Sequence, residues 1–577
     1  MLAHLIGFCF LTGWVYPFYG LPIYSFYQEW LSGTLLCACF FLCIWQRGQQ
    51  GRPYKSLVVP STAWAVLGLF AVGALQWMAG VHPYPPAIAL FGAAGVLFWM
   101  AVTLGASMTT AHAPDDQELK RMLLVVGQWI LWSAILSASI VLVQVVGWDI
   151  HIFPLIRSPD LGFDRPSANL SQPNLMTLQL VLGWVVLGWM YTEEKISSLR
   201  SIAIALLFAT AVFFANTRAY LLMLAALAIF SWKIDAPRAR VVRWWACVIL
   251  PTIFMVSAPF HASVMKSLGY VGRSVFIPYG DGRFAIWGAS LQIIQDHPFF
   301  GVGLGAYATG FYDQATSSFG KIGATGNAHN VWLQIAAECG LFAGLSILVL
   351  MAQWLFKALR NRNQPQWVVF FNAAIGAMFA HSLVEFPLWF IFFLVPAGFF
   401  LGVTSQANGS KVHTVGPGYP YAMLGVIPAV IVSGWMYLDY MKVREFFEDA
   451  VTIRNSQAIE SLRAYEQPSW LSWHIRYAQF LFMDESKVSP EHMWATGRAV
   501  VPRFPFSMGL MRFARVSAST NHMDDARKAM TVLYQMKPRA YQAFKAEIFD
   551  GCQPDHPQAM SYCPLKEMVD EIPQEVK

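Results

Sequence analysis

The chain has little charge and lacks the usual motifs of a soluble enzyme. Only 12% of its 577 residues are charged, about half of the roughly 25% found in soluble domains. There is no run of Lys and Arg with interleaved aromatic residues, so nucleic-acid binding is not expected. The sequence also contains no P-loop, no DxD or HExxH motif and no CxxC pair. These absences predict a protein that works without a nucleotide, a bound metal or a cofactor.

The sequence instead contains many long apolar stretches, and 56% of its residues are hydrophobic and 15% aromatic. A helix that crosses a bilayer needs about 20 mostly apolar residues. The hydropathy pattern predicts about thirteen such helices, and hence an all-α polytopic bundle. The two pairs 201–214/219–232 and 367–383/387–404 are short, and each is also compatible with one broken or re-entrant element. The predicted spans are 3–19, 28–46, 57–80, 87–110, 122–147, 174–191, 201–214, 219–232, 244–260, 330–356, 367–383, 387–404 and 421–440.

Lys and Arg are distributed unevenly between alternate loops, which predicts the orientation of the bundle. One set of loops carries fifteen of them, whereas the short loops of the other set carry only Arg157, Arg165 and Arg218. Because basic residues stay on the cytoplasmic side, the N-terminus is predicted to be cytoplasmic. The first apolar stretch lacks a basic flank and a cleavage site, so we expect a retained helix. The location predicted is a bacterial inner membrane, with 148–173, 261–329 and 441–577 on the periplasmic side.

The last part of the chain differs in composition from the rest. Residues 1–440 are predicted to form the transmembrane catalytic domain, with a long periplasmic loop at 261–329. Residues 441–577 are more charged and predict a helical periplasmic domain, with amphipathic stretches at 443–465 and 524–536. Helix pairs of the tetratricopeptide kind are compatible with it, although no 34-residue period aligns. In an oxidising periplasm Cys552 and Cys563 form either a disulfide or two free thiols.

Two arginines on the predicted outer side have no evident structural task. Arg218 lies between two short spans with no acidic residue in its flanks, and Arg283 begins an apolar helical stretch in the long loop. A guanidinium binds a phosphate through two parallel hydrogen bonds. The alternative for Arg218 is an arginine that reaches to the membrane interface. The glycines after Arg283, in 298–305, predict a loop whose backbone approaches a ligand or a helix closely, or an ordinary turn.

A histidine stands just before the span at 330–356. His329 is followed by Asn330, which can cap the helix, and Glu338 lies nine residues further on. A histidine at the outer mouth of a helix bundle can act as a general base near neutral pH, although a lone histidine is more often structural. Glu338 needs a partner inside the span, and we expect one of the arginines, a proton or a structural hydrogen bond.

Two further polar segments lie at the same predicted face. His381 and Glu385 are four residues apart and face one another if helical, but Pro387 interrupts the helix. The segment 165–174 carries Arg165 and the amides of Asn169, Gln172 and Asn174, which suit sugar hydroxyls and phosphate. A hydrogen-bonded turn and a plain loop are the structural alternatives.

Taken together, these residues resemble a known family. Arg218, the run from Arg283 through Trp287, Pro298 and Gly301, and the stretch from His329 to Gly340 are similar to the O-antigen ligase/polymerase superfamily. Within it, the segments 165–174 and 381–389 resemble bacterial protein O-oligosaccharyltransferases of the PglL type. Phe386, where that pattern often has Tyr, is a mild departure. The resemblance covers roughly 160–560.

The resemblance implies a fold, a reaction and a role for each residue. The fold implied is a helical membrane domain of the GT-C-like kind. The reaction implied is transfer of an oligosaccharide from undecaprenyl pyrophosphate to Ser or Thr of periplasmic proteins such as pilins, without a metal. His329 would accept the hydroxyl proton, and Arg218 and Arg283 would bind the diphosphate. Substrate-binding roles are implied for Arg165, Asn169, Gln172, Asn174, Asn330, Glu338, His381 and Glu385.

Three alternatives follow from the same observations. An O-antigen ligase would use lipid A-core as the acceptor, and a polymerase would use a second lipid-linked glycan. A lipid or solute transporter belongs to another class, and it predicts internal repeats and polar groups at the bilayer midplane. The sequence shows no repeat between its halves, and its polar groups lie at one face, so a glycosyltransferase is favoured.

Overall fold

The protein is almost entirely helical, as predicted. A computed structural model describes residues 1–49, 57–81, 85–110, 117–158, 165–268, 270, 282–314, 326–361, 364–415, 418–553 and 559–569. Within these residues the strands are β1 (Leu57–Pro60) and β2 (Val412–Val415), which pair antiparallel. The span predicted at 57–80 is therefore helical only from Ser61, because its first residues pair with the segment before α18. Parts of the predicted 261–329 loop, 271–281 and 315–325, lie outside the described residues.

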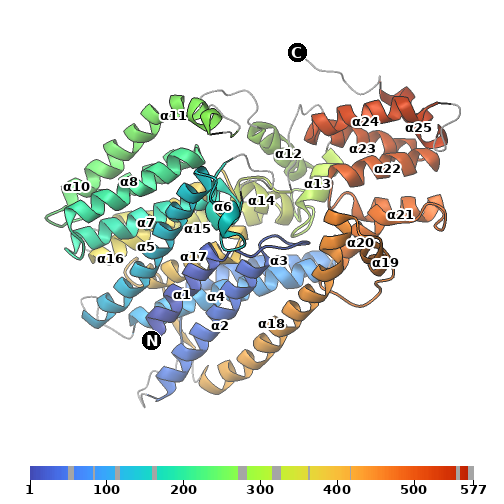
Figure 1. Cartoon of the computed structure of the whole chain (residues 1–577). Helices are drawn as coiled ribbons and strands as arrows, with labels where there is room; N and C mark the ends of the chain where they lie inside the picture. Colours follow the sequence, from blue (N-terminus) through green and yellow to red (C-terminus); the bar gives the residue numbers. More distant parts are fainter. Residues whose placement is uncertain are drawn as a thin grey trace.

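Long apolar helices form the body of the molecule (Figure 1). Eight helical segments of the described chain are long and apolar enough to cross a bilayer, and three shorter apolar helices accompany them. Both short pairs consist of two separate helices, α8 with α9 and α16 with α17. A polytopic helical membrane protein is confirmed, and the number of thirteen crossings stays a prediction. The helices of this part are α1 (Leu2–Val15), α2 (Phe26–Gln49), α3 (Ser61–Met78), α4 (Pro85–Thr110), α5 (Gln117–Val145), α6 (Asp149–Ile152), η1 (Ala168–Leu170), α7 (Pro173–Thr192), α8 (Ser198–Ala215), α9 (Ala219–Ser231), α10 (Ala239–Trp244), α11 (Leu250–Ser267), α15 (Leu341–Arg360), α16 (Gln366–Ser382), η3 (Pro387–Trp389), α17 (Ile391–Ser405) and α18 (Gly418–Glu448).

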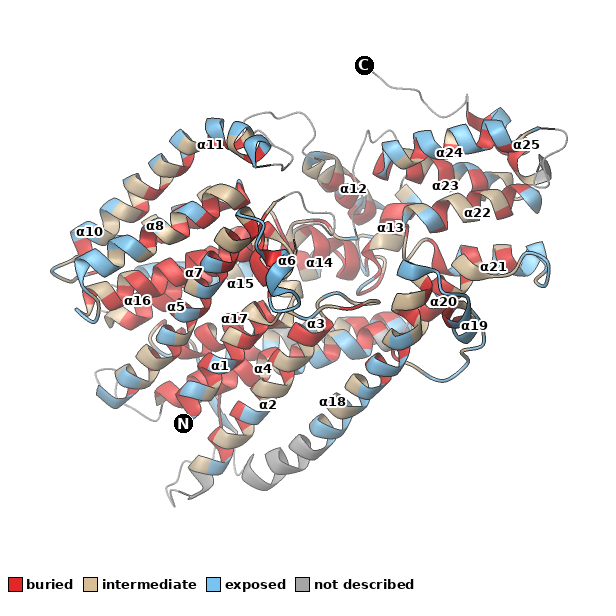
Figure 2. Cartoon of the chain, in the orientation of Figure 1, coloured by how far each residue is buried: buried red, intermediate tan, exposed pale blue. Residues whose placement is uncertain are grey.

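The centre of this bundle is tightly packed. Helices α7 and α16 are buried along almost their whole length (Figure 2). Helices α4 and α17 approach so closely that a Cβ built on Gly402 would lie 2.1 Å from the carbonyl oxygen of Val102. Small residues permit such contact between membrane helices, where packing replaces the hydrophobic effect as the driving force. The peripheral helices instead expose large apolar side chains, such as Phe342 and Val349 of α15.

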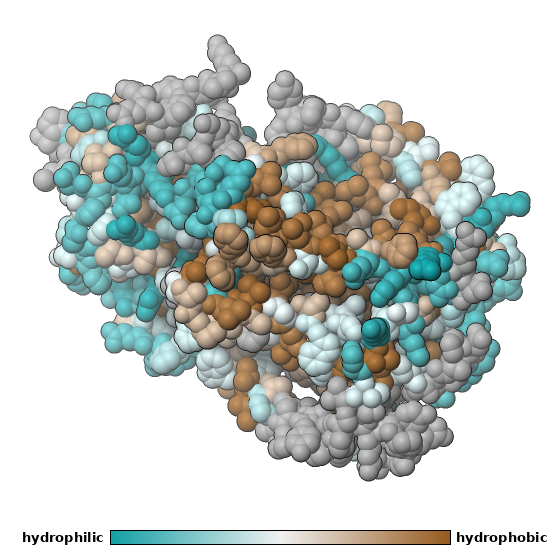
Figure 3. Space-filling view, turned by 180° about the vertical axis from the view of Figure 1, so that it is seen from behind, coloured by the Kyte–Doolittle hydropathy of each residue, from teal (hydrophilic) through white to brown (hydrophobic). Residues whose placement is uncertain are grey.

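The surface of the molecule separates apolar from polar regions. Seen from behind, apolar side chains gather over the middle of the molecule, and hydrophilic side chains cover the side where the C-terminal helices lie (Figure 3). A wide exposed apolar region of this kind fits contact with the hydrocarbon of a bilayer rather than water.

The span predicted at 330–356 is two helices, α14 (Val331–Cys339) and α15, which meet at Gly340. Gly340 has a φ of +90°, and a Cβ there would lie 2.1 Å from the carbonyl oxygen of Phe299. The next residue, Leu341, donates its N–H to the carbonyl of Pro298 at 2.8 Å. The helix breaks here because the turn at 298–303 packs directly on its backbone, which only glycine permits.

The tail continues from the membrane part without a break at the predicted boundary, because residue 440 lies inside α18. The helices α19 to α25 then follow in sequence and pack one against the next (Figure 1). They share one buried core with the helices of the long loop, since Ile293, Tyr307 and Leu333 cluster with Phe480 and Leu533. The tail and the long loop therefore form one packed body over the membrane part. Its helices are α12 (Arg283–Asp296), α13 (Tyr307–Gln314), α14, α19 (Ser456–Arg463), α20 (Ser472–Phe482), α21 (Pro490–Val500), α22 (Ser507–Ser519), α23 (Met523–Met536), α24 (Pro538–Gly551) and α25 (Ala559–Val569).

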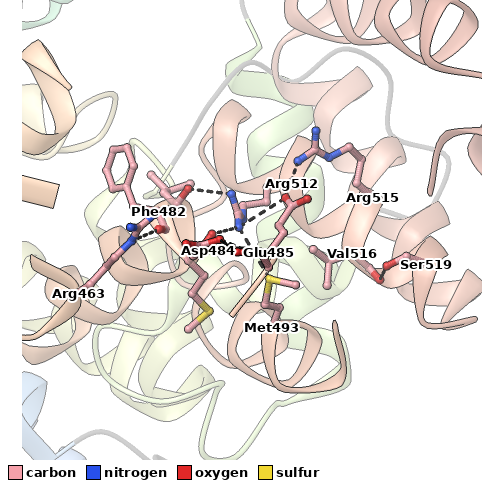
Figure 4. A network of polar contacts seen from close by, with 12 residues as sticks. Arg463, Phe482, Asp484, Glu485, Met493, Arg512, Arg515, Val516 and Ser519 are labelled. Carbon is pink, nitrogen blue, oxygen red and sulfur yellow. Dashed lines mark hydrogen bonds and ion pairs between the residues drawn. The ribbon is translucent and has the colours of Figure 1, made fainter. Parts of the chain in front are cut away.

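Several arginines of the tail form hydrogen bonds and ion pairs with other groups of the tail. Figure 4 shows three arginines around the turn that follows α20. Arg512 donates to the carbonyls of Leu481 (3.0 Å) and Met483 (2.6 Å), and Arg515 pairs with Glu485 at 3.1 Å. Arg463 donates to the carbonyl of Phe482 at 2.5 Å. These cations close a turn between helices, which argues against a phosphate-binding patch at this place.

The open question about the two tail cysteines is answered by the structure. Cys552 and Cys563 form a disulfide that joins the end of α24 to α25. The other six cysteines carry free thiols in or beside the apolar helices.

Gln76 attaches the C-terminal end of α3 to neighbouring segments. Helix α3 is largely exposed, but Gln76 on it is completely buried. Its Nε2 donates to the carbonyls of Glu338 (2.7 Å) and Phe300 (2.5 Å), and its Oε1 accepts from the N–H of Leu304 at 3.0 Å. Gln76 thus ties α3 to the same turn that breaks the helix at Gly340.

We expect Gln76→Leu to lower the apparent unfolding temperature of the purified protein in detergent. The change removes three hydrogen bonds at once, to the carbonyls of Glu338 and Phe300 and from the N–H of Leu304, and each contributes about 0.5–1.5 kcal/mol. Gln353→Leu, an exposed position on α15, is the matched control and should leave the temperature unchanged. Intrinsic fluorescence during heating measures both, and equal temperatures for the two variants would contradict the role given to Gln76.

Candidate active site

The carboxylate of Glu385 lies at the centre of the polar groups predicted from the sequence. Glu385 is in the short connection between α16 and η3, and its side chain is 2% exposed. Its Oε2 lies 2.9 Å from Nδ1 of His329, and its Oε1 forms an ion pair with Nη2 of Arg283. Asn174, on the first turn of α7, donates from Nδ2 to the same Oε1 at 2.5 Å. One carboxylate therefore joins four segments that are far apart in the sequence.

The surroundings of Glu385 keep it ionised. Burial by itself would raise the pKa of the carboxyl, but the hydrogen bond and charge of His329, with the charges of Arg283 and His381, outweigh it and lower the pKa below its usual value. An ionised carboxylate can only accept hydrogen bonds, so Nδ1 of His329 carries the hydrogen and donates it. When the ring is neutral, its other nitrogen, Nε2, is the proton acceptor.

His329 is held in place by the residues on either side. Its backbone has a φ of +47°, in the left-handed region, and its N–H donates to the side chain of Asn327 at 3.2 Å. Asn330 caps α14 by accepting from the N–H groups of the next turn, as predicted, and donates to the carbonyl of Leu383 at 3.0 Å. The ring meets the ring of Phe386 edge to face at 5.1 Å. Uncommon backbone conformations of this kind concentrate at functional sites.

Arg283 is the first residue of α12, and its side chain is 24% exposed. The helix is fixed to the histidine loop because Nε1 of Trp287 donates to the carbonyl of Ala328 at 3.1 Å. Arg283 and His329 therefore belong to one local unit, with Glu385 bound between them.

Arg218 is exposed at the start of α9, and its turn is tied to the first turns of α7. The hydroxyl of Thr217 donates to that of Thr177 at 3.0 Å, one turn along α7 from Asn174. Nη1 of Arg165 donates to the carbonyls of Ala215 (2.8 Å) and Asn216 (3.0 Å). Arg165 thus supports the turn before Arg218 through hydrogen bonds from its guanidinium to backbone carbonyls.

Asn169, Gln172 and His381 complete the set of predicted residues. The buried amide of Asn169 donates to the carbonyls of Val15 (2.9 Å) and Leu155 (3.0 Å) and so fixes its own loop. Gln172 is the residue that precedes α7. His381 is fully buried on the last turn of α16, where it interacts electrostatically with Glu385 and Arg283.

Glu338 forms a structural hydrogen bond, which is one of the three alternatives that the sequence leaves open for it. Its Oε1 accepts from Nε2 of Gln334 at 2.8 Å and from the N–H of Tyr307 at 3.3 Å. The glycine-rich turn beside it packs on a helix rather than facing a ligand. Val302 and Gly303 donate their N–H groups to the carbonyls of Ala337 (2.9 Å) and Glu338 (3.0 Å).

Arg157 is a polar residue of this region that the sequence motifs did not single out. Its guanidinium lies over the ring of Tyr19, 4.0 Å from the centroid, and it contacts the hydroxyl of Ser171. The signal was present, because Arg157 is one of only three basic residues in the short outer loops. The aromatic partner, more than a hundred residues away, could not be inferred.

Comparison with known proteins agrees with this geometry. Residues 202–348 match the O-antigen ligase family, and residues 369–545 match a family described as virulence factor membrane-bound polymerase, C-terminal. A general O-oligosaccharyltransferase of Acinetobacter baylyi is 24% identical over 452 residues, which are 76% of this chain and 74% of that protein. A ComP-specific O-oligosaccharyltransferase of the same organism is 23% identical over 404 residues, 67% of this chain and 71% of that protein.

The two matched segments contain Arg218, Arg283 and His329 in the first and His381 and Glu385 in the second. The contact between His329 and Glu385 therefore joins the two matched regions of the sequence. These matches confirm the resemblance found in the motifs: the chain is a membrane glycosyltransferase similar to O-oligosaccharyltransferases and to the O-antigen ligase family.

Proposed function

We propose that the protein transfers an oligosaccharide en bloc from undecaprenyl diphosphate to Ser or Thr hydroxyls of periplasmic proteins such as pilins. The observation that carries the proposal is the contact of one buried carboxylate with both a histidine and an arginine. This arrangement places a base beside a cation, which is what attack by a hydroxyl on a diphosphate-linked sugar requires. The names of the two relatives support a protein acceptor.

In the proposed reaction Nε2 of His329 takes the proton from the acceptor hydroxyl. The hydroxyl oxygen bonds to the anomeric carbon as the bond from that carbon to the diphosphate oxygen breaks. The products are the glycosylated protein and the polyprenyl diphosphate, and the proton remains on the imidazole. Glu385 acts through His329, because it fixes the tautomer and stabilises the imidazolium that forms.

The diphosphate gains negative charge as the bond breaks, and Arg283 and Arg218 are proposed to stabilise it. The two arginines lie on different elements, since Arg283 begins α12 and Arg218 precedes α9. A guanidinium offers its donors in a rigid plane that matches phosphate oxygens. Asn174, Gln172 and His381 are proposed to shape the surroundings of the sugar or the acceptor.

The proposed location of the reaction is the periplasmic face of the inner membrane. The uneven distribution of Lys and Arg in the loops supports this side. The Cys552–Cys563 disulfide supports it independently, because disulfides persist in oxidising compartments. The tail carries this disulfide and shares a core with α12 and α14. Arg283 is the first residue of α12, and His329 lies just before α14. All of these groups therefore lie on one side.

A different acceptor is the second candidate. The match of residues 202–348 to the O-antigen ligase family also fits transfer to lipid A-core, or to another lipid-linked glycan. The chemistry at His329 and Arg283 would be the same, and only the hydroxyl donor would differ. The experiment below therefore offers a protein acceptor and a lipid acceptor in parallel.

We expect purified protein, supplied with an undecaprenyl diphosphate glycan and a pilin, to increase the pilin mass by one glycan. His329→Ala should reduce this rate about 10²- to 10⁴-fold, the usual contribution of a general base. His492→Ala, an exposed histidine on α21, should have no effect. Intact-protein mass spectrometry measures the product, and modification of lipid A-core but of no protein would overturn the proposed acceptor.

We expect Glu385→Gln to lower kcat between about 10- and about 100-fold, less than loss of the base itself. The amide cannot stabilise an imidazolium as a carboxylate does, whereas the KM for the glycan donor should change little. Glu445→Gln on the exposed face of α18 is the matched control. An unchanged kcat, or a loss that follows a lower unfolding temperature, would show that Glu385 is structural only.

A further inference from the structure

A large apolar cavity lies at the end of the bundle opposite to the candidate active site. It has an empty volume of about 850 Å³, and no charged residue lines it. Helices α7, α8, α9 and α16 and the segment 241–250 contribute its walls, among them Gly188, Ile202, Leu227, Val242 and Phe370. Gly188 lies fourteen residues beyond Asn174 on α7, roughly 21 Å along the helix. Because Asn174 contacts Glu385, the cavity is far from the reacting groups.

The cavity opens sideways, at one end of α8. The other end of this helix is attached to α11, since the side chains of Asn216 and His261 are hydrogen-bonded at 3.0 Å. Ile202 of α8 and Val241 of α10 both line the cavity, and their side chains are 43% and 42% exposed. The mouth of the cavity therefore lies on the lateral surface of the bundle, between α8 and α10. Such an apolar space suits hydrocarbon chains and excludes charged solutes.

The loops at this end of the bundle carry an excess of positive charge. The segments 193–200 and 233–243 contain six Lys and Arg residues against three acidic residues. One of the acidic residues, Glu193, is already paired with Lys120 of α5 at 2.5 Å. Figure 1 shows α10, which belongs to the second segment, at the far left of the view and away from α12. A basic region beside an apolar cavity favours a ligand that has both a negative charge and a hydrocarbon part.

Two arginines of this basic region contact residues of the cavity wall. Arg243 donates from Nη2 to the carbonyl of Ile234 at 3.4 Å, and its Nε is buried with no hydrogen-bond partner among the described residues. Arg238 lies over the ring of Tyr191, 4.8 Å from the centroid, and pairs with Glu194 at 3.6 Å. A buried N–H group without a partner is costly, so an acceptor oxygen at Arg243 would be favourable. Phosphate oxygens match a guanidinium in charge and geometry.

We propose that this cavity binds an anionic phospholipid of the membrane, with its acyl chains between α8 and α10 and its phosphate at Arg243. Basic pockets between membrane helices bind such headgroups on the cytoplasmic side, which is the side that the loop charges predict here. Ser198 and Ser201 also line the cavity and offer hydroxyls to the glycerol part. This lipid is distinct from the glycan donor, and the inference does not depend on the proposed reaction.

Binding of phosphatidylglycerol and of phosphatidylcholine with the same acyl chains to the purified full chain tests the proposal. Native mass spectrometry gives each Kd. We expect phosphatidylglycerol to bind more tightly, and Arg243→Gln to raise its Kd about fivefold. Ile202→Trp fills the mouth and should raise the Kd about tenfold. The matched controls should change neither value: Lys411→Gln removes an exposed charge before β2, and Leu206→Trp changes an exposed residue of α8 outside the cavity lining.

The proposal is overturned if wild type binds both lipids equally, if Arg243→Gln and Ile202→Trp leave the Kd unchanged, or if the controls have the same effect. Glycerol 1-phosphate carries the phosphate without acyl chains, and displacement of the lipid by it would indicate a site for free phosphates instead. An unfolding temperature equal to that of wild type, without added lipid, shows that a variant is folded. If Arg243→Gln fails this control, Arg238→Gln makes the same test at the second arginine.

Discussion

The arrangement of the site depends on the burial of one ionised carboxylate. An unpaired buried charge costs several kcal/mol, so Glu385 must be compensated by its neighbours. His329, Arg283 and Asn174 supply that compensation from the loop before α14, the start of α12 and the start of α7. The three elements can only meet if the long loop packs down on the membrane helices. The same interaction therefore organises the fold around the site and, in the proposed reaction, orients the histidine for proton transfer.

A second constraint separates the loop of His329 from the long apolar helix that follows it. Helix α14, which follows His329, ends before Gly340. It ends there because the turn at 298–303 packs on the backbone of Gly340. The next helix, α15, then continues as an exposed apolar span. The break separates the segment that carries the reacting histidine from the segment that contacts lipid.

Local patterns were sufficient to predict the helices and most of the polar residues of the site. Apolar runs located the membrane helices, and the Arg283 and His329 segments were recognised because their residues lie close together in the sequence. The pairing of His329 with Glu385 was not predicted, since 56 residues separate them. Each side chain could equally have had a hydrogen-bond partner within its own segment. The two backbone carbonyls that Arg165 binds and the N–H of Tyr307 that donates to Glu338 were not predicted either, and the substrate-binding roles of both residues stay predictions. In each case the partner is set by tertiary packing, which hydropathy and spacing do not encode.

The central claim is that Glu385 acts through His329, and a double-mutant cycle on kcat/KM for glycan transfer tests it most directly. His329→Ala, Glu385→Gln and the double variant are compared with wild type in one reconstituted assay. Residues that work as a unit are strongly non-additive. The account predicts that the double variant is no slower than His329→Ala within about twofold. Losses that multiply would show that the two residues act independently, and would contradict it.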